Sequence, residues 1–306
     1  MPGDTVMAYK SSRRVDASAV ALAPFAAFQW RLLLLWMLAT LIATLVAALP
    51  FLQSLGALLD HSTHAHAWAR QFDGLMFTDV AVALSHEHAT LHGAMLASAL
   101  LMLLWLPWLN GMAVASGRAA RALSFGGLLQ GGLTEYGRMF RLTLWSVLPY
   151  ALAGFLVQMA LDKADDRGDL ATLQSQADAA QHIALWAAGV VVVLAQAWVE
   201  SARASFIADV GLRSATVALV RGLLQVLRRP FSTLLVYLLL TSVGVAIALG
   251  FGLLRVHTLA VGTTGLLWGL VLSQLVVAAL GWMRVARLFA LADVGRSLGM
   301  GRRSGF

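Results

Sequence analysis

WVESARASFIADVG at residues 198–211 and WMRVARLFALADVG at residues 282–295 are two copies of one motif, and they decide how this chain folds. We call them copy 1 and copy 2; both fit the pattern W-x3-A-R-x4-A-D-V-G. Each copy follows a long apolar run. At such a place a tryptophan suits the headgroup level of a bilayer and an arginine suits anionic lipid on the cytoplasmic side. The motif therefore predicts where a helix leaves the membrane and is not a catalytic signature.

Composition places the chain among multi-pass membrane proteins. Hydrophobic residues make up 59% of the 306 residues and charged residues only 12%, whereas soluble domains carry about 25% charged residues. The net charge of +7 is typical of arginines that hold loops in the cytoplasm, so it predicts topology and not binding to nucleic acid. Because the chain has no cysteine, disulfides and cysteine-based catalysis are excluded.

Six apolar stretches approach the length of about 20 residues that a membrane-spanning helix needs. They lie at residues 32–52, 91–113, 142–161, 183–199, 231–254 and 258–283. We therefore predict an all-α, six-span transmembrane bundle over residues 32–283. A cytoplasmic tail at residues 1–31 precedes it, and a basic cytoplasmic tail at residues 284–306 follows it. An even number of spans places both tails on one side of the membrane.

The distribution of basic residues predicts which side that is. Of the 22 Lys and Arg residues, 18 fall in the two tails and in the second and fourth loops between spans. Loops rich in Lys and Arg stay in the cytoplasm, where anionic lipids are their partners. We therefore expect a bacterial inner-membrane protein with both termini inside.

The segment before the fifth span is expected to form an amphipathic helix on the inner leaflet. Its apolar residues at 217, 220, 224 and 227 recur at helical spacing, and its arginines fall on another face. A proline at position 230 suits the start of the next helix. In the second loop, glycines at positions 126, 127, 131 and 132 are expected to break any similar helix.

The two copies start 84 residues apart, which predicts a parallel repeat of helical hairpins. Within each copy the arginine and the aspartate are six residues apart, and six residues turn a helix by about 600°. The two side chains therefore point to different sides of one helix. One hypothesis pairs them across the repeat, Arg203 with Asp293 and Arg287 with Asp209. The alternative places the arginines on lipid phosphates and leaves the aspartates as caps or solvated charges.

Histidines gather in the first outer loop and at its edges. His88 and His92 share one helix face at i, i+4, and His64 and His66 could add ligands for a divalent transition metal. The same cluster would alternatively titrate between roughly pH 5 and 7 and act as a pH sensor. A third interpretation is a polar periplasmic loop whose histidines carry no function, because no recognised metal-binding signature accompanies them.

The sequence carries no P-loop, no G-x-S-x-G motif and no dinucleotide-binding fingerprint, so an enzyme is disfavoured and no organic cofactor is expected. The predicted spans lack charged side chains, which disfavours ion-coupled transport. Arginines of the basic face could instead bind anionic headgroups of membrane lipids. The expected contacts are Arg138, Arg141, Arg203, Arg221 and Arg287.

Several short motifs resemble those of a group of uncharacterised six-span inner-membrane proteins of Gram-negative bacteria. They are GG at 131–132, YGRMFRL at 136–142, ARA at 202–204 and RRP at 228–230. The likeness covers most of the chain from the first span onward. It implies a helical bundle with cytoplasmic interfacial helices and no assigned activity, and it does not include the histidine-rich loop.

Three functions fit these patterns. The favoured one is a non-enzymatic scaffold or accessory subunit of an envelope or export complex, because catalytic groups are missing and the basic face is broad. The second is a permease or lipid-handling protein that binds anionic headgroups through the arginines. The third is a periplasmic metal or pH sensor. Membrane lipids are expected partners in every case, and other membrane subunits in the first.

Overall fold

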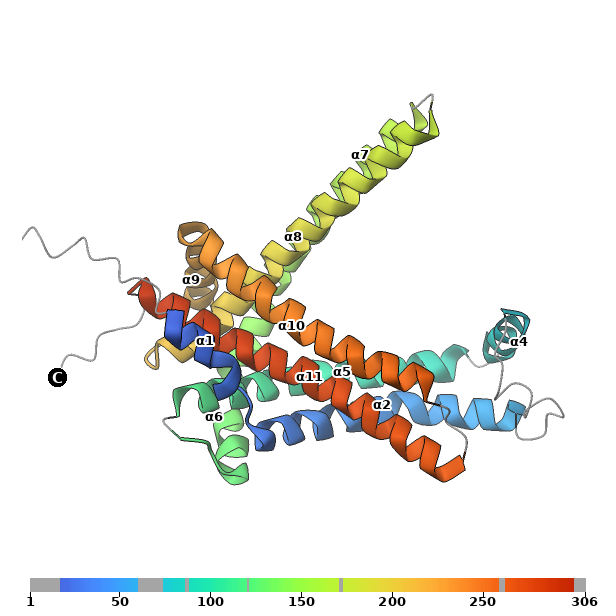
Figure 1. The fold of residues 1–306 in the computed structure, drawn as a ribbon, viewed down its shortest axis with the longest axis horizontal. Coiled ribbons are helices and arrows are strands. Elements are labelled where there is room, and N and C mark those ends of the chain that lie inside the picture. Colours follow the sequence, from blue (N-terminus) through green and yellow to red (C-terminus); the bar gives the residue numbers. More distant parts are fainter. Residues whose placement is uncertain are drawn as a thin grey trace, which may run out of the picture. The chain divides into compact units, whose positions relative to one another are not determined.

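The computed structural model describes residues 17–59, 74–85, 88–119, 121–170, 173–258 and 262–299. Within these ranges the structure is helical and no strand is present (Figure 1). This confirms the predicted all-α class. The helices are α1 (Ala17–Ala26), α2 (Trp30–Leu59), α4 (Gly74–Ser85), α5 (His88–Arg118), α6 (Phe125–Trp145), α7 (Val147–Asp169), α8 (Gln174–Ala208), α9 (Ala215–Arg228), α10 (Pro230–His257) and α11 (Gly262–Ser297).

Six helical stretches are long and apolar enough to cross a bilayer. They are Trp30–Ala57, Ala89–Arg118, Phe125–Asp169, Gln174–Ala208, Pro230–His257 and Gly262–Ser297. Each of them overlaps one of the spans expected from the sequence. By length and composition, the chain is therefore an integral, multi-pass membrane protein.

The helices that carry the two motif copies do not end where the apolar runs end. α8 continues beyond Trp198 to Ala208, and α11 continues beyond Trp282 to Ser297. With 35 and 36 residues, each helix is about 50 Å long, whereas the hydrocarbon core of a bilayer is about 30 Å thick. Copy 1 as far as Ala208 and the whole of copy 2 therefore lie within long helices. Residues 284–297 of the predicted C-terminal tail are helical.

The third apolar stretch is interrupted at Ser146. α6 ends at Trp145 and α7 begins at Val147. Pro149 explains the break, because proline has no N–H to donate to the carbonyl of Trp145 and its ring would collide with that carbonyl in a continuous helix. The hydroxyl of Ser146 donates to the Thr143 carbonyl at 2.6 Å, which satisfies one carbonyl near the end of α6.

The glycines of the second loop do not break the helix, contrary to expectation. α6 begins after Ser124, whose hydroxyl accepts a hydrogen bond from the backbone N–H of Gly127, and it continues through all four glycines. Gly131 of α6 and Gly111 of α5 let the two helices approach closely. A Cβ on Gly131 would lie 2.5 Å from the Cβ of Ala115, and a Cβ on Gly111 would lie 2.8 Å from the carbonyl oxygen of Gly132. These glycines therefore serve helix contact.

The chain divides into two compact units. Unit 1 contains the described residues within Met1–Gln29, Asn110–Gly244 and Trp282–Phe306, and unit 2 contains those within Trp30–Leu109 and Val245–Gly281. In unit 2 the hydroxyl of Ser98 on α5 donates to the Ala43 carbonyl on α2 at 2.7 Å. A Cβ on Gly281 would lie 3.3 Å from the Trp36 ring, so α11 and α2 also meet closely in this unit.

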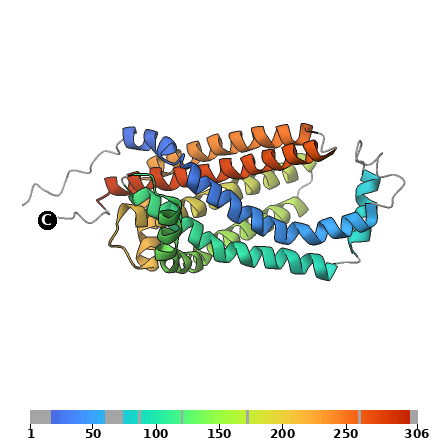
Figure 2. The same ribbon diagram turned by 90° about the horizontal axis from the view of Figure 1, so that it is seen from below.

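Unit 1 holds both motif copies. In it α7 lies along α8, and α9 lies along the end of α8 (Figures 1 and 2). Its core includes Met112, Leu128, Phe206 and Leu288, which are almost completely buried. Because segments from the beginning, middle and end of the chain build this core, unit 1 is where the charged residues of distant segments meet.

Candidate functional site

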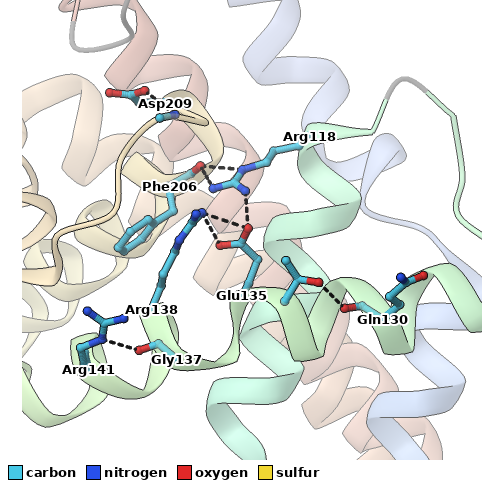
Figure 3. Close-up of polar contacts among 10 residues, drawn as sticks. Arg118, Gln130, Glu135, Gly137, Arg138, Arg141, Phe206 and Asp209 are labelled. Atoms are coloured by element: carbon cyan, nitrogen blue, oxygen red, sulfur yellow. Dashed lines mark hydrogen bonds and ion pairs between the residues drawn. The ribbon is translucent and has the colours of Figure 1, made fainter.

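Glu135 is the centre of the first cluster of charges in unit 1. This buried carboxylate on α6 accepts hydrogen bonds from Arg118 at 2.6 Å and from Arg138 at 3.0 and 3.1 Å (Figure 3). Arg118 also donates from Nε and Nη2 to the Phe206 carbonyl at 2.9 and 2.6 Å. That carbonyl is among the last four of α8, which have no partner inside the helix. One guanidinium thus ties α5 to α6 and caps α8.

Asp209 organises the turn that follows copy 1. It leaves the helix with extended backbone angles, and its carboxylate accepts hydrogen bonds from the Gly211 N–H at 2.9 Å and from Arg221 on α9 at 2.8 Å. The hydroxyl of Ser214 then accepts from the Val217 N–H and caps the start of α9. The aspartate of copy 1 therefore fixes both the end of α8 and the position of α9.

α9 crosses α8 with almost no space between the two backbones. A Cβ on Gly222 would lie 2.6 Å from the Ala202 nitrogen and 2.7 Å from the Trp198 carbonyl oxygen. The indole N–H of Trp198 donates to the Leu219 carbonyl at 2.8 Å. Copy 1 thus meets α9 through backbone contact and one buried hydrogen bond.

The arginine of copy 2 lies in a second cluster of charges. Arg287 donates to Glu200 of copy 1 at 2.8 Å and to the Thr241 hydroxyl at 2.9 Å, and its guanidinium lies 4.9 Å from the centre of the Tyr237 ring. The side chains of Arg287 and Glu200 are only 8% and 3% exposed. Isolated charges are very costly in such a place, so each stabilises the other.

This second cluster carries excess positive charge. Arg203 and Arg284 lie within electrostatic reach of each other, and Arg284 also lies within reach of Glu200 and Arg287. Arg284 is therefore close to two other guanidinium groups and to one carboxylate. Glu200 Oε2 and Arg287 Nε are buried without a hydrogen-bond partner. The cluster fixes the two long helices to each other through the ion pair between Glu200 and Arg287.

The two copies are joined by charge, but by other partners than the repeat predicted. One hypothesis paired Arg203 with Asp293 and Arg287 with Asp209, and its alternative left the aspartates as caps or solvated charges. Instead Arg287 binds Glu200, Asp209 binds Arg221, and Asp293 binds Arg296 one turn later on α11. These pairs form because each aspartate has a basic residue nearby in the sequence. Arg221 is on the helix that follows Asp209, and Arg296 is on the same helix as Asp293.

The arginines expected on lipid headgroups lie in different surroundings. Arg203 and Arg287 are buried, so they face protein. The side chains of Arg138 and Arg221 are 22% and 27% exposed, and each is bound to a carboxylate. Arg141 is exposed and donates to the Gly137 carbonyl at 3.0 Å. Of the five, Arg141 is the one whose surroundings leave it open to a headgroup.

The histidine cluster falls largely outside the described residues. His64 and His66 lie in the undescribed range 60–73, and for His88 only the backbone is described. His92 is exposed near the start of α5. Within the described residues no group of three or more potential ligands could hold a metal ion, but His64 and His66 are not among these residues. The metal site stays a prediction.

A pocket of about 460 Å³ opens in unit 1 beside α1. We call it the α1 pocket. Its walls are mostly apolar, with Leu22 and Ala26 from α1, Ile207 from α8 and Phe289 from α11. Its polar lining includes Arg121, Asp293 and Arg296. The pocket therefore combines an apolar wall with two guanidinium groups and one carboxylate.

Sequence reasoning missed Glu135 and Glu200, the two buried carboxylates that organise the clusters. A signal was present for each. Glu135 lies three residues before Arg138, a spacing at which opposite charges meet on a helix. Glu200 occupies the position in copy 1 at which copy 2 has Arg284, so equivalent positions carry opposite charges.

Comparison of the chain with family models, with curated proteins and with solved structures finds no match. The resemblance to six-span inner-membrane proteins therefore depends on the short motifs alone. What can be argued about function comes from the geometry of this chain.

Proposed function

We propose that this membrane protein is a non-enzymatic subunit that holds a membrane-spanning helix of a partner protein against its α7–α8 hairpin. The charged residues of unit 1 support a structural role, because Glu135, Glu200 and Asp209 are each bound to an arginine from another part of the chain.

The surface of the α7–α8 hairpin carries the proposal. α7 and α8 lie against each other, held in part by the hydrogen bond from the Tyr150 hydroxyl to Gln196 at 3.1 Å. Outward they expose large apolar side chains, among them Phe155 at 66% and Trp186 at 79%. In the membrane such a surface meets either lipid or the helix of another chain.

Two glycines favour a helix over lipid. Gly154 on α7 and Gly189 on α8 are exposed, and a Cβ on either would meet no atom within 4 Å. Counted from the Tyr150–Gln196 contact, they lie at nearly the same height on the hairpin, within about one helical turn. Small residues allow close backbone approach, which is what drives helix association in lipid.

Affinity purification in a mild detergent tests the proposal. Gly154→Leu and Gly189→Leu are accommodated by this chain alone, because both positions are open. We expect a stoichiometric partner with the natural protein and its loss with either variant. Gly250→Leu on α10, which is equally open, is the matched control and should keep the partner. A partner retained by all three variants, or cross-linking only to a second copy of the chain, would contradict the proposal.

The orientation is part of the same proposal, with both termini in the cytoplasm of a bacterium and the arginines beside the anionic inner leaflet. Its support is the distribution of Lys and Arg along the chain. Since the chain has no cysteine, single cysteines report the topology cleanly. We expect an impermeant thiol reagent to label Ser62→Cys in intact spheroplasts and to label Arg228→Cys only after lysis. The reverse result would overturn the orientation.

A further inference from the structure

We propose that the α1 pocket binds one anionic phospholipid, with its phosphate on Arg121 and Arg296 and the start of an acyl chain along the apolar wall. This site is separate from the α7–α8 hairpin and does not depend on a partner protein. It uses neither of the charged clusters that hold the long helices together.

Charge is the first reason. Arg121 is exposed, and the side chain of Arg296 is 46% exposed even while it binds Asp293. A guanidinium has five N–H donors in a fork, so Arg296 keeps donors for a phosphate after binding one carboxylate oxygen. Two guanidinium groups against one carboxylate leave the polar lining net positive. This balance fits a ligand with a single negative charge.

The apolar wall is the second reason. Leu22, Phe28, Ile207 and Phe289 line the same pocket as the two arginines. An inorganic anion would gain nothing from these side chains, because it has no apolar surface to bury. A lipid gains from both parts, since its phosphate meets the arginines while its glycerol and first methylene groups leave water. A volume of about 460 Å³ is in the usual range for a small-molecule site.

The position along the chain is the third reason. α5 ends at Arg118 and α11 ends at Ser297, so the pocket lies where two long apolar helices finish. Phe25 and Phe28 beside it are 77% and 71% exposed. Exposed phenylalanines next to arginines are typical of helices that lie in the interface of a bilayer. Phospholipid is abundant at this level, so the pocket opens where the proposed ligand is.

Native mass spectrometry of the full chain released from detergent tests the site. The probes are dioleoylphosphatidylglycerol, dioleoylphosphatidylcholine and glycerol 3-phosphate, each titrated separately. We expect the anionic lipid to bind with the highest affinity. The double variant Arg121→Gln, Arg296→Gln should weaken it by about 20-fold, from the loss of two basic contacts. Arg213→Gln, an exposed arginine of unit 1 that does not line the pocket, is the matched control and should change it by less than about twofold.

A second variant separates the pocket from general surface charge. Ala26→Phe fills the apolar part and leaves both arginines, so we expect it to weaken the anionic lipid and to leave the melting temperature unchanged. Equal binding of the two lipids, or equal loss in the double variant and in Arg213→Gln, would overturn the site. Glycerol 3-phosphate binding as tightly as the lipid would overturn the role of the acyl chain. Full lipid binding by Ala26→Phe would show that the pocket is not where the lipid lies.

Discussion

Copy 1 and copy 2 share one motif but reach different structures after the shared aspartate. In copy 1 the helix ends at Ala208. The backbone of Asp209 is extended, and its carboxylate accepts hydrogen bonds from Gly211 and Arg221. In copy 2 the helix continues through Asp293 and Gly295 and ends only at Ser297. The same letters A-D-V-G therefore form a turn in one place and a helix in the other.

The residues that follow the motif account for the difference. Three residues after Asp293 comes Arg296, which binds it on the helix surface, whereas three residues after Asp209 comes Leu212. With no cation at that position, Asp209 is free to cap the turn. Gln225 of α9 then lies at Gly295 and donates to the Leu291 carbonyl at 3.0 Å. The turn of copy 1 thus lets α9 pack on the continuing helix of copy 2.

One role is common to both copies. The tryptophan of each donates its indole N–H to a carbonyl of a short helix, Trp198 to Leu219 on α9 at 2.8 Å and Trp282 to Pro24 on α1 at 2.9 Å. The sequence pattern predicted both tryptophans as headgroup anchors and did not predict these hydrogen bonds to short helices. The motif therefore holds a short helix against a long one in each copy.

The largest expected change in stability comes from breaking a buried charge pair, compared with breaking a surface one. Glu200→Gln leaves Arg287 buried without a counter-charge, and we expect a loss of about 3 kcal/mol or more in stability. Asp293→Asn removes an exposed pair and should cost under about 1 kcal/mol. Thermal melting in detergent measures both. The double variant Glu200→Gln, Arg287→Met should recover part of the loss, and similar melting of the two single variants would contradict the contrast.

The second-largest loss of stability is expected where copy 1 crosses α9. Gly222→Ala would force the backbones of α8 and α9 apart, and overpacking of this kind costs about 1–3 kcal/mol. Gly126→Ala on α6 meets no atom within 4 Å, so it should be neutral or stabilising by up to about 1 kcal/mol. The melting temperatures of the two variants measure this difference in stability. A stable Gly222→Ala protein would show that the helices are not in backbone contact.

Replacing Asp209 or Asp293 should change stability by a smaller amount, and the two changes should differ. Asp209→Ala removes a cap and the pair with Arg221, for an expected loss of about 1–2 kcal/mol. Asp293→Ala should cost less than about 1 kcal/mol, because α11 continues on both sides of it. Hydrogen exchange followed by mass spectrometry adds a local measure. Faster exchange should be confined to α9 in the first variant, and equal exchange in α9 for both variants would count against the capping role.

The smallest effect tests the role that both copies share. Trp198→Phe and Trp282→Phe each remove one hydrogen bond to a carbonyl and keep most of the ring, so each should cost about 1 kcal/mol. Because they hold different short helices, the two losses should add in the double variant. Melting curves of the three proteins measure this. A double variant no worse than either single one would mean that the tryptophans act as one unit.

Hydropathy was enough to predict the membrane class and the approximate six spans, because burial in lipid demands long apolar helices. It could not predict that α8 and α11 continue beyond the apolar runs, since these parts of both helices are buried by protein and are joined by contacts such as Glu200 with Arg287. The break at Ser146 could have been foreseen from Pro149. Close helix crossings at Gly131 and Gly222 depend on tertiary contact, which single-chain periodicity does not contain.

The hydrogen bond from Trp282 to the Pro24 carbonyl joins positions 258 residues apart. Ribosomes make the chain from its amino end, so α1 leaves the exit tunnel long before the indole that will hold it has been synthesised. α1 therefore lacks this contact while the intervening helices are synthesised and inserted. Completion of unit 1 is thus set by the last helix to be translated, and truncation before residue 282 would leave its first helix without this anchor.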